Sequence, residues 1–257
     1  MTLTDTHTHL YLPEFDDDRT DMVKRAQEQG VSRCILPNID SESLPQMKRM
    51  KAEFPDFCEM AMALHPTSVK ENFLEELAIC YKELKTGKYV AIGEMGIDLY
   101  WDKTFYEQQQ QAFRTQIKWA KEFDLPVIIH SRDSFSEIFE LMDELWTPGL
   151  QGVFHCFSGT QLEAEKIIKD YQFKLGLGGV LTFKNTTLRE EIKDIGCEHF
   201  LLETDAPFLA PVPYRGKRNE SAYVSLVAQK LAEVKACSVE EIADITNQNA
   251  RRLFFRN

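Results

Sequence analysis

Five short apolar runs in this chain each end in a residue of the kind that binds metals. The runs are Leu3–His9 (with His7 and His9), Val90–Glu94, Val127–His130, Gly152–His155 and Phe200–Asp205. In parallel β/α folds the functional groups gather at the carboxyl ends of the strands, so residues far apart in sequence can meet there. The pattern therefore predicts one metal site assembled from five distant segments, as in a hydrolase.

Strand-like runs alternate with amphipathic segments along the whole chain. The expected strands are Leu3–His7, Arg33–Pro37, Glu59–His65, Val90–Glu94, Val127–His130, Gly152–Phe157, Phe173–Gly178 and Phe200–Thr204. Eight such units in about 250 residues match a (β/α)8 barrel. A doubly wound open sheet is the alternative, but it binds its ligand at one switch point. Since the ligands fall on five strands, we predict the α/β class and a single (β/α)8 TIM barrel over residues 1–257. Its metal site is expected at the C-terminal ends of the strands.

Two segments carry the spacing of a helix start. Ser238 and Glu241 match a capping box, in which the serine side chain accepts from the backbone three residues on. Ser134 and Glu137 repeat this spacing just after the His130 run. Both segments are expected to begin helices.

Composition excludes several classes of protein. The net charge of −11 argues against a general duplex-binding protein, whose binding face would be basic. The six cysteines form no C-x-x-C pair, which favours reduced thiols and a cytoplasmic location. No signal peptide fits the amino terminus, and no apolar run approaches the roughly 18–20 residues that span a bilayer.

The first and fourth expected strands supply the most specific ligand candidates. His7 and His9 are two residues apart, so on a strand both side chains would point to one side and could reach one metal. Glu94 follows an apolar strand and is flanked by glycines. Its two carboxylate oxygens could bridge two cations, which makes it a candidate catalytic residue as well as a ligand. Asp98 could orient a ligand or close a loop.

The fifth expected strand, Val127–His130, ends in a histidine and is followed by charged residues. His130 is a ligand candidate, although a single histidine there is also compatible with a core position. Arg132 is always charged and could hold a phosphate. A salt bridge between Arg132 and Asp133 is the alternative.

The sixth and eighth expected strands supply the remaining candidate ligands. His155 ends the apolar run of the sixth expected strand. Cys156 would alternate away from the site if that strand continued. Glu203 and Asp205 share one side of the last strand. Asp205 lies nearer the open end and is assigned to metal binding and proton transfer, whereas Glu203 lies deeper and would support the site by hydrogen bonding.

Residues that could contact substrate surround these ligands. His65 ends the third strand and could touch substrate without binding metal. A basic loop comes after the last strand and contains Tyr214, Arg215, Lys217 and Arg218. Loops after barrel strands lie on the active face, so these residues could bind phosphates and stack a base. An ordinary solvated loop, paired with acidic residues elsewhere, is the alternative.

Together these segments resemble the TatD-type metal-dependent DNases. The matching motifs are His7-Thr8-His9, Gly93-Glu94-Met95-Gly96-Ile97-Asp98, His130-Ser131-Arg132-Asp133, His155-Cys156-Phe157-Ser158-Gly159, Glu203-Thr204-Asp205-Ala206-Pro207, Pro213–Asn219 and Asn249–Phe254. The resemblance runs from about residue 4 to residue 255 and implies a barrel of the amidohydrolase superfamily. It departs from the usual family pattern at Thr67, where a second histidine is common, and at Leu99-Tyr100-Trp101.

The resemblance also implies a cofactor and a reaction. The cofactor is two divalent metal ions, magnesium, zinc or manganese, with six ligands. These are His7, His9 and Asp205 for one ion, His130 and His155 for the second, and Glu94 for both. The implied reaction is hydrolysis of DNA phosphodiester bonds, often in the 3′-to-5′ direction, by a metal-activated water with Asp205 as proton acceptor. DNA or an oligonucleotide is the expected partner, with no obligate protein partner. A dinuclear amide, lactone or aminoacyl-ester hydrolase of the same superfamily is the alternative, and a non-catalytic binding protein is a second one.

Overall fold

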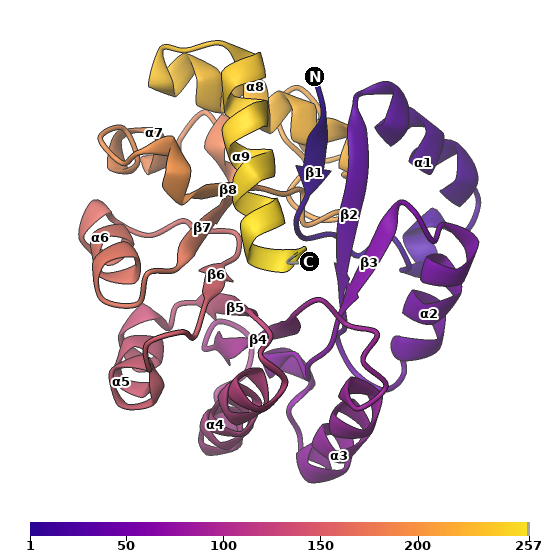
Figure 1. Ribbon diagram of the computed structural model, residues 1–257, viewed down its shortest axis with the longest axis vertical. Helices are drawn as coiled ribbons and strands as arrows, with labels where there is room; N and C mark the ends of the chain where they lie inside the picture. The colour runs from indigo at the N-terminus through magenta and orange to yellow at the C-terminus, as the bar shows by residue number, and fades with distance from the viewer. Residues whose placement is uncertain (256–257) are drawn as a thin grey trace.

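A ring of eight parallel strands forms the centre of the computed structural model, which describes residues 1–255 (Figure 1). The strands are β1 (Leu3–Asp5), β2 (Val31–Pro37), β3 (Cys58–Ala61), β4 (Ile92–Asp98), β5 (Val127–Arg132), β6 (Gly152–Phe154), β7 (Lys174–Leu177) and β8 (Phe200–Leu202). They lie around the barrel in sequence order. Residues 256 and 257 of the range predicted for the single domain lie outside the described residues.

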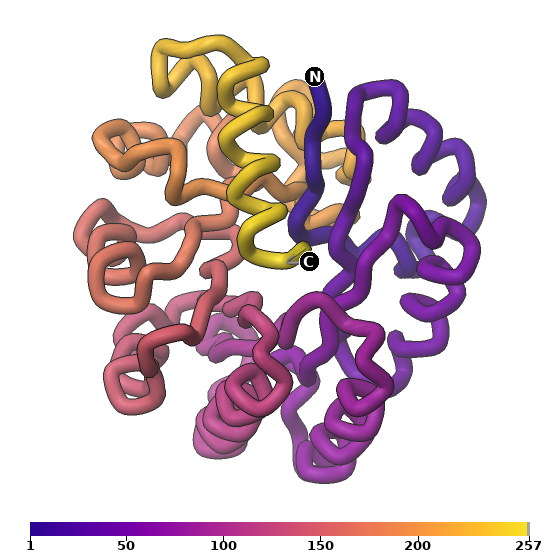
Figure 2. Tube along the Cα trace, viewed as in Figure 1, coloured from indigo at the N-terminus to yellow at the C-terminus, as the bar shows by residue number. Residues whose placement is uncertain are grey.

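Helices surround this ring. The α-helices are α1 (Arg19–Glu28), α2 (Leu44–Glu53), α3 (Phe73–Leu84), α4 (Tyr106–Phe123), α5 (Phe135–Leu145), α6 (Gln161–Lys169), α7 (Leu188–Glu191), α8 (Val224–Lys235) and α9 (Val239–Phe254). Short 3-10 turns are η1 (Pro13–Phe15), η2 (Pro66–Ser68), η3 (Gly179–Thr182), η4 (Cys197–His199) and η5 (Ser221–Tyr223). Figure 2 shows that the chain winds once around the barrel, so that its last helix returns beside its first strand.

Backbone hydrogen bonds close the ring at two joints. Between β3 and β4, Val90 N donates to Met60 O at 2.9 Å and Met62 N donates to Ala91 O at 3.0 Å. Between β8 and β1, Thr6 N donates to Leu202 O at 3.0 Å. An open sheet would leave such edge groups unpaired. The doubly wound alternative is therefore wrong, and the predicted (β/α)8 barrel is confirmed.

Strands β1 and β8 are shorter than the sequence predicts because a side chain replaces the ladder between them. The buried carboxylate of Asp5 accepts from Thr204 N at 2.9 Å and from Thr204 Oγ1 at 2.7 Å. Regular pairing therefore stops at Asp5 and Leu202. His7 and His9 thus lie in a segment beyond the strand, and the strand alternation used to align them does not apply.

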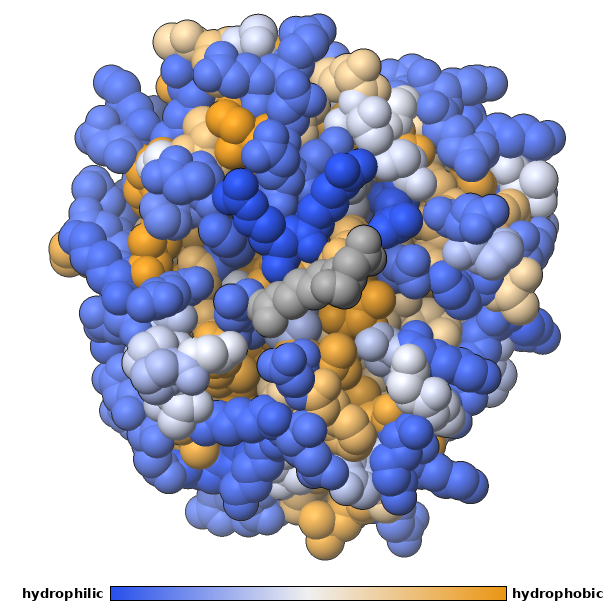
Figure 3. Space-filling model, viewed as in Figure 1, coloured by the Kyte–Doolittle hydropathy of each residue, from blue (hydrophilic) through white to orange (hydrophobic). Residues whose placement is uncertain are grey.

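The end of the barrel that faces α9 is filled with apolar side chains. Residues of six strands or their flanks meet three residues of α9 there. This cluster contains Ile35, Ala61, Ala91, Ile128, Val153, Leu201, Ala250, Leu253 and Phe254. Thr4 Oγ1 also donates to Asn247 Oδ1 at 2.7 Å, which fastens α9 to β1. Helix α9 therefore seals this end, and the surface seen from this side is predominantly hydrophilic (Figure 3).

Both expected helix starts are confirmed, but their serines act differently. The Ser238 side chain accepts from Glu241 N at 3.2 Å at the start of α9, as the spacing predicts. Ser134 precedes α5 but makes no such cap. Its hydroxyl donates to Ile97 O at 2.6 Å and accepts from Arg132 N at 3.1 Å. The capping interpretation of Ser134 was therefore wrong, because this hydroxyl ties β4 to the end of β5.

Candidate metal centre

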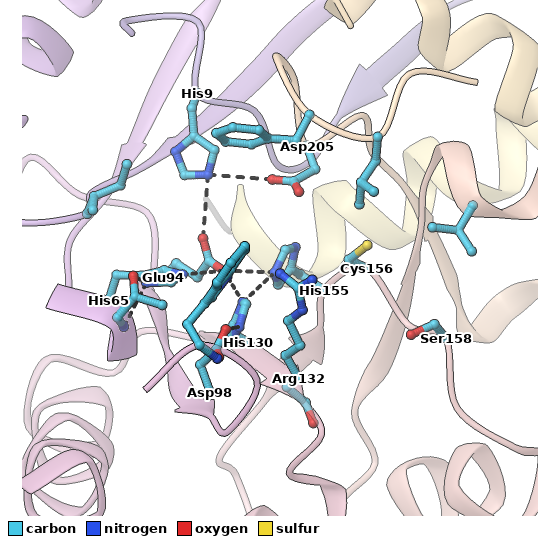
Figure 4. A pocket seen from close by; sticks show the side chains of 17 residues that line it. His9, His65, Glu94, Asp98, His130, Arg132, His155, Cys156, Ser158 and Asp205 are labelled. Carbon is cyan, nitrogen blue, oxygen red and sulfur yellow. Dashed lines mark hydrogen bonds and ion pairs between the residues drawn. The ribbon is translucent and has the colours of Figure 1, made fainter. Parts of the chain in front are cut away.

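Histidines and carboxylates from six strand ends meet at the barrel end opposite α9. Three groups of these residues have ligand atoms close enough to hold a metal ion. The groups are His7, His9 and Glu94; His65, Glu94 and His130; and His7, His155 and Glu203. Figure 4 shows His9 and Asp205 on one side of Glu94, with His130, Asp98 and Arg132 on the other. The arrangement agrees with the expectation that distant runs form one site.

Glu94 lies at the centre of the site and is 2% exposed. Its Oε2 atom lies 3.0 Å from His7 Nε2 and 3.5 Å from His9 Nε2. Its Oε1 atom lies 2.8 Å from both His130 Nδ1 and His155 Nε2, and 3.3 Å from His65 Nε2. The two oxygens of one carboxylate therefore face two different sets of imidazoles, as a bridging ligand requires.

Asp205 lies beside the first of these sets. Its Oδ1 atom is 3.7 Å from His7 Nε2 and 3.6 Å from His9 Nε2. Its backbone is in the left-handed region, with φ of +56°, and its amide donates to His7 O at 2.9 Å. This bond couples the end of β8 to the segment after β1 and brings Asp205 to the two histidines.

The charges of the site favour ionised carboxylates. Burial opposes ionisation of Glu94, but the positive potential of His155, His65 and His7 outweighs it and holds the Glu94 pKa well below its usual value. Burial also opposes ionisation of Asp205, yet a hydrogen bond from His9 and nearby imidazoles lower its pKa. A buried pair of ionised carboxylates among imidazoles is a suitable environment for a divalent cation.

Unpaired buried atoms provide a test of whether the residues fit a metal. Among the described residues, His7 Nδ1 and Glu203 Oε2 are buried without a hydrogen-bond or ion-pair partner. Buried nitrogen and oxygen atoms without partners cost free energy, and native proteins rarely leave several together. Imidazole nitrogens and carboxylate oxygens are common metal ligands. The donor set therefore fits the metals that the sequence predicts.

Asp98 and Glu203 each contact one of the candidate histidine ligands. Asp98 Oδ2 lies 2.9 Å from His130 Nε2, so the ring is held between Asp98 and Glu94. Glu203 Oε1 lies 3.4 Å from His155 Nδ1 and accepts a short hydrogen bond from Cys156 N. Carboxylates that orient ligating histidines commonly tune metal sites. The supporting roles of Asp98 and Glu203 stay predictions.

Two further residues position the site and were not singled out from the sequence. Tyr11 Oη lies 2.9 Å from His9 Nδ1 and donates to Pro37 O, which fixes the His9 ring. Asp5 anchors Thr204 next to Asp205, and burial raises its pKa to about 7. The sequence signal was their place within two residues of His7 and His9.

A pocket of about 720 Å³ opens over the cluster. His65 and Arg132 line it, as the substrate-binding prediction requires. Cys156 also lines it, so the expectation that this side chain points away was wrong. The strand β6 ends at Phe154, and Cys156 has a φ of +47°, so strand alternation no longer determines its direction.

The basic loop lies outside the pocket lining, and three of its side chains have other partners. Arg218 pairs with Asp18 at 2.7 Å, and the Arg215 guanidinium stacks 3.8 Å from the Phe183 ring centre. Tyr214 stacks on Tyr223 with ring centres 4.2 Å apart, and Lys217 is exposed. For Arg218 the structure shows the alternative interpretation, in which the loop pairs with acidic residues elsewhere.

A (β/α)8 barrel with a buried histidine and carboxylate cluster at its open end defines a metal-dependent hydrolase. Comparison with known families makes this assignment specific. The model of the family described as TatD related DNase matches residues 4–255. The chain belongs to this family and is a metal-dependent hydrolase that acts on ester bonds.

Individual relatives cover nearly the whole chain. The chain is 41% identical to the uncharacterized metal-dependent hydrolase YabD of Bacillus subtilis, over 98% of each chain. It is 32% identical to the 3′-5′ ssDNA/RNA exonuclease TatD of Erwinia tasmaniensis, over 97% of this chain and 98% of the relative. The crystal structure of YjjV, a TatD homologue from Escherichia coli, aligns with a TM-score of 0.88 and 30% identity, over 99% of this chain and 98% of YjjV.

Two other observations bear on the expectations from composition. Within residues 1–255, none of the helices has the length and apolar character needed to cross a membrane. All six cysteines are free thiols.

Proposed function

We propose that the protein removes nucleotides from the 3′ end of single-stranded DNA by hydrolysing phosphodiester bonds, in the cytoplasm. The observation that carries this proposal is the pairing of the Glu94 cluster with Arg132 at the wall of one pocket. Arg132 is the one lysine or arginine among the described residues that line the pocket. No described carboxylate forms an ion pair with it, so its charge is available for a phosphate. The exonuclease name of the Erwinia relative supports the same substrate.

We assign the metal ligands as the sequence resemblance implied them. His7, His9 and Asp205 would hold one divalent ion, and His130 and His155 a second. Glu94 would contact both, since its two oxygens face the two sets. Ions bound there would supply a water of lowered pKa and positive charge for the phosphate oxygens. His65 faces the same Glu94 oxygen as His130 but is assigned to substrate, because it lies on the turn before η2 at the pocket wall.

The protein residues have distinct tasks in this reaction. Asp205 is ionised and borders the pocket, and at 15% exposure its side chain is more accessible than that of Glu94. This accessibility supports a role for Asp205 in accepting a proton from the attacking water. Arg132 would hold a non-bridging phosphate oxygen and stabilise the charge that develops on it. Asp98 keeps His130 oriented while the substrate binds.

Hydrolysis of a 3′-labelled single-stranded oligonucleotide tests the proposal. The protein is stripped of metal, magnesium, manganese or zinc is added back, and the His130→Ala variant is run beside it. We expect metal-dependent release of labelled nucleotide that the variant lacks. A 5′-labelled copy of the same oligonucleotide should shorten in single steps, which separates an exonuclease from an endonuclease. Absence of cleavage with every metal, together with turnover of small esters or amides, would favour the other hydrolase class.

A further inference from the structure

An exposed aromatic pair, Tyr100 and Trp101, lies beside the pocket. Tyr100 is 52% exposed and Trp101 is 69% exposed, and Trp101 lines the pocket. Large aromatic side chains are mostly buried in soluble proteins, so an exposed pair beside a polar site points to a ligand. The two rings meet edge to face, with centres 4.8 Å apart.

This pair is held in place by the metal site itself. Asp98 Oδ1 accepts from Tyr100 N at 3.0 Å and from Trp101 N at 3.2 Å. The other oxygen of Asp98 lies 2.9 Å from His130 Nε2. One carboxylate therefore connects a candidate metal ligand to the backbone of both aromatic residues, and a group that stacks on them has a defined position relative to the ligands.

The far side of the loop is fixed as well. Lys70 Nζ lies 3.3 Å from Asp102 Oδ2 and 5.2 Å from the centre of the Phe105 ring. Asp102 Oδ1 accepts from Thr104 N at 2.8 Å. These contacts come directly after Trp101, so the exposed aromatic pair belongs to a loop with anchors at both ends. A surface that is ordered before binding loses less entropy when a ligand stacks on it.

The two aromatic residues differ in what covers them. The Arg132 guanidinium lies 3.8 Å from the centre of the Tyr100 ring and 5.2 Å from that of the Trp101 ring. Tyr100 therefore supports the arginine that we assign to the phosphate. Trp101 lines the pocket and keeps most of its surface exposed. A cation for a phosphate and a free aromatic face beside it match the chemistry of one nucleotide.

We propose that Trp101 stacks the unpaired nucleobase next to the scissile phosphate while Arg132, supported by Tyr100, holds the phosphate. This inference rests on the proposed function and names the residue that would give it a preference for single strands. Stacking on an exposed face requires a base that is free of its partner strand, so Trp101 selects single-stranded ends. Aromatic stacking tolerates every base, because each base has a π-face. Discrimination between base sequences is therefore expected to be weak.

The test removes the aromatic ring and the base separately and together. Oligonucleotides with an abasic site at the terminal or the penultimate position are compared with the intact strand in wild-type and Trp101→Ala protein. With wild type we expect one of the two abasic sites to raise KM about tenfold. With Trp101→Ala the intact strand should show the same rise, and the abasic site should add nothing further. Trp101→Phe, which keeps a flat ring, should recover most of the loss. Leu162→Ala is the matched control, since Leu162 is an exposed apolar residue on α6.

Binding provides a second readout that does not depend on turnover. A phosphorothioate single strand, which resists hydrolysis, is titrated into the metal-loaded protein while tryptophan emission is recorded. We expect quenching that is absent in Trp101→Phe, because the protein's other tryptophans are Trp119, which is buried, and Trp146, which bonds to Tyr171 O.

The two readouts separate the inference from the proposed function. Quenching by the intact strand but not by the abasic strand, without cleavage, would refute the exonuclease proposal and support the stacking. Trp101→Ala and the abasic site could also raise KM independently, so that the combined rise is the product of the two single rises. Cleavage with this behaviour would refute the stacking and support the exonuclease. Absence of both cleavage and quenching would overturn both.

Discussion

The two ends of the barrel are built from the same strands but differ in polarity. At the α9 end, Ile128 and Val153 pack against Leu253 and Phe254 in an apolar cluster. At the other end, the same two strands lead into His130 and His155, two positions further along the chain in each case. The difference shows that each strand carries stability at its start and chemistry at its end. Substitutions at the two ends should therefore have separable effects on stability and on turnover.

The largest expected effect is on turnover at the open end. Asp205→Asn should reduce kcat by about a thousandfold, because asparagine cannot accept the proton. Asparagine also tolerates the left-handed backbone that Asp205 adopts, so the fold should persist. Steady-state kinetics and a thermal melt measure the two quantities. Near-normal turnover in this variant would contradict the assignment of Asp205.

At the end sealed by α9, a substitution should lower stability and leave turnover unchanged. Leu253→Ala leaves a cavity at the apolar cluster and should lower the free energy of unfolding by about 3 kcal/mol. Activity per folded molecule should stay unchanged at temperatures well below the melt. Chemical denaturation and kinetics on the same preparation check this. A loss of kcat with full folding would mean that the two ends are coupled.

Metal affinity should rise with pH. Burial lowers the pKa values of His9 and His155, but neighbouring groups, chiefly Tyr11 and Asp205 for His9 and Glu94 for His155, more than compensate and raise both well above the usual value. In the metal-free protein these imidazoles carry protons that a cation must displace. Affinity should therefore increase about tenfold per pH unit for each proton released. Calorimetry in two buffers of different ionisation enthalpy counts those protons. An affinity that does not change between about pH 6 and pH 8 would contradict this picture.

A smaller effect on metal affinity is expected from Asp98, which contacts the candidate ligand His130. Asp98→Asn keeps the size of the side chain but removes the charge that orients His130, and it should lower metal affinity by about ten- to a hundredfold. Direct titration with zinc or manganese measures the change. Unaltered affinity would show that His130 is oriented by Glu94 alone.

The smallest effects are expected in the basic loop. Arg218→Ala breaks the ion pair with Asp18, which is partly exposed, and should cost at most about 1 kcal/mol of stability. Charge reversal at Arg215, Lys217 and Arg218 should leave kcat/KM on an oligonucleotide nearly unchanged, whereas Arg132→Glu should reduce it strongly. A large loss from the loop variant would restore the substrate-binding role predicted from the sequence.

Much of the candidate site could be predicted because its residues follow apolar runs in or just after the barrel strands. The candidate ligands His7, Glu94, His130 and His155 end such runs, and a parallel barrel brings the carboxyl-terminal parts of its strands to one face. Glu94 nevertheless lies inside β4, which continues to Asp98 instead of ending at Glu94 as expected. The alternation of side chains along a strand was a less reliable guide where a side chain replaced the backbone hydrogen bonds between two strands. Asp5 ends β1 early by bonding to Thr204, so strand periodicity could not place His7 or His9.

Composition was a weaker guide than position for the basic residues. Arg132 and Arg218 both lie near the active face, and the sequence could not tell which of them is paired. Arg218 meets Asp18, which is 200 residues away in the chain, whereas Arg132 stacks on Tyr100 and stays free of described carboxylates. Such partners are decided by long-range packing and leave no signal in the local sequence.

The sequence alone determined the barrel, the family and the residues expected to cluster, because these depend on the order of the strands and on the residue types near their carboxyl ends. Only the tertiary structure decided which oxygen of Glu94 faces which histidine, that Cys156 borders the pocket, and that Trp101 lines it and is exposed. These features depend on backbone directions after the strands end. Beyond the last ladder bond, neither strand nor helix periodicity constrains where a side chain points.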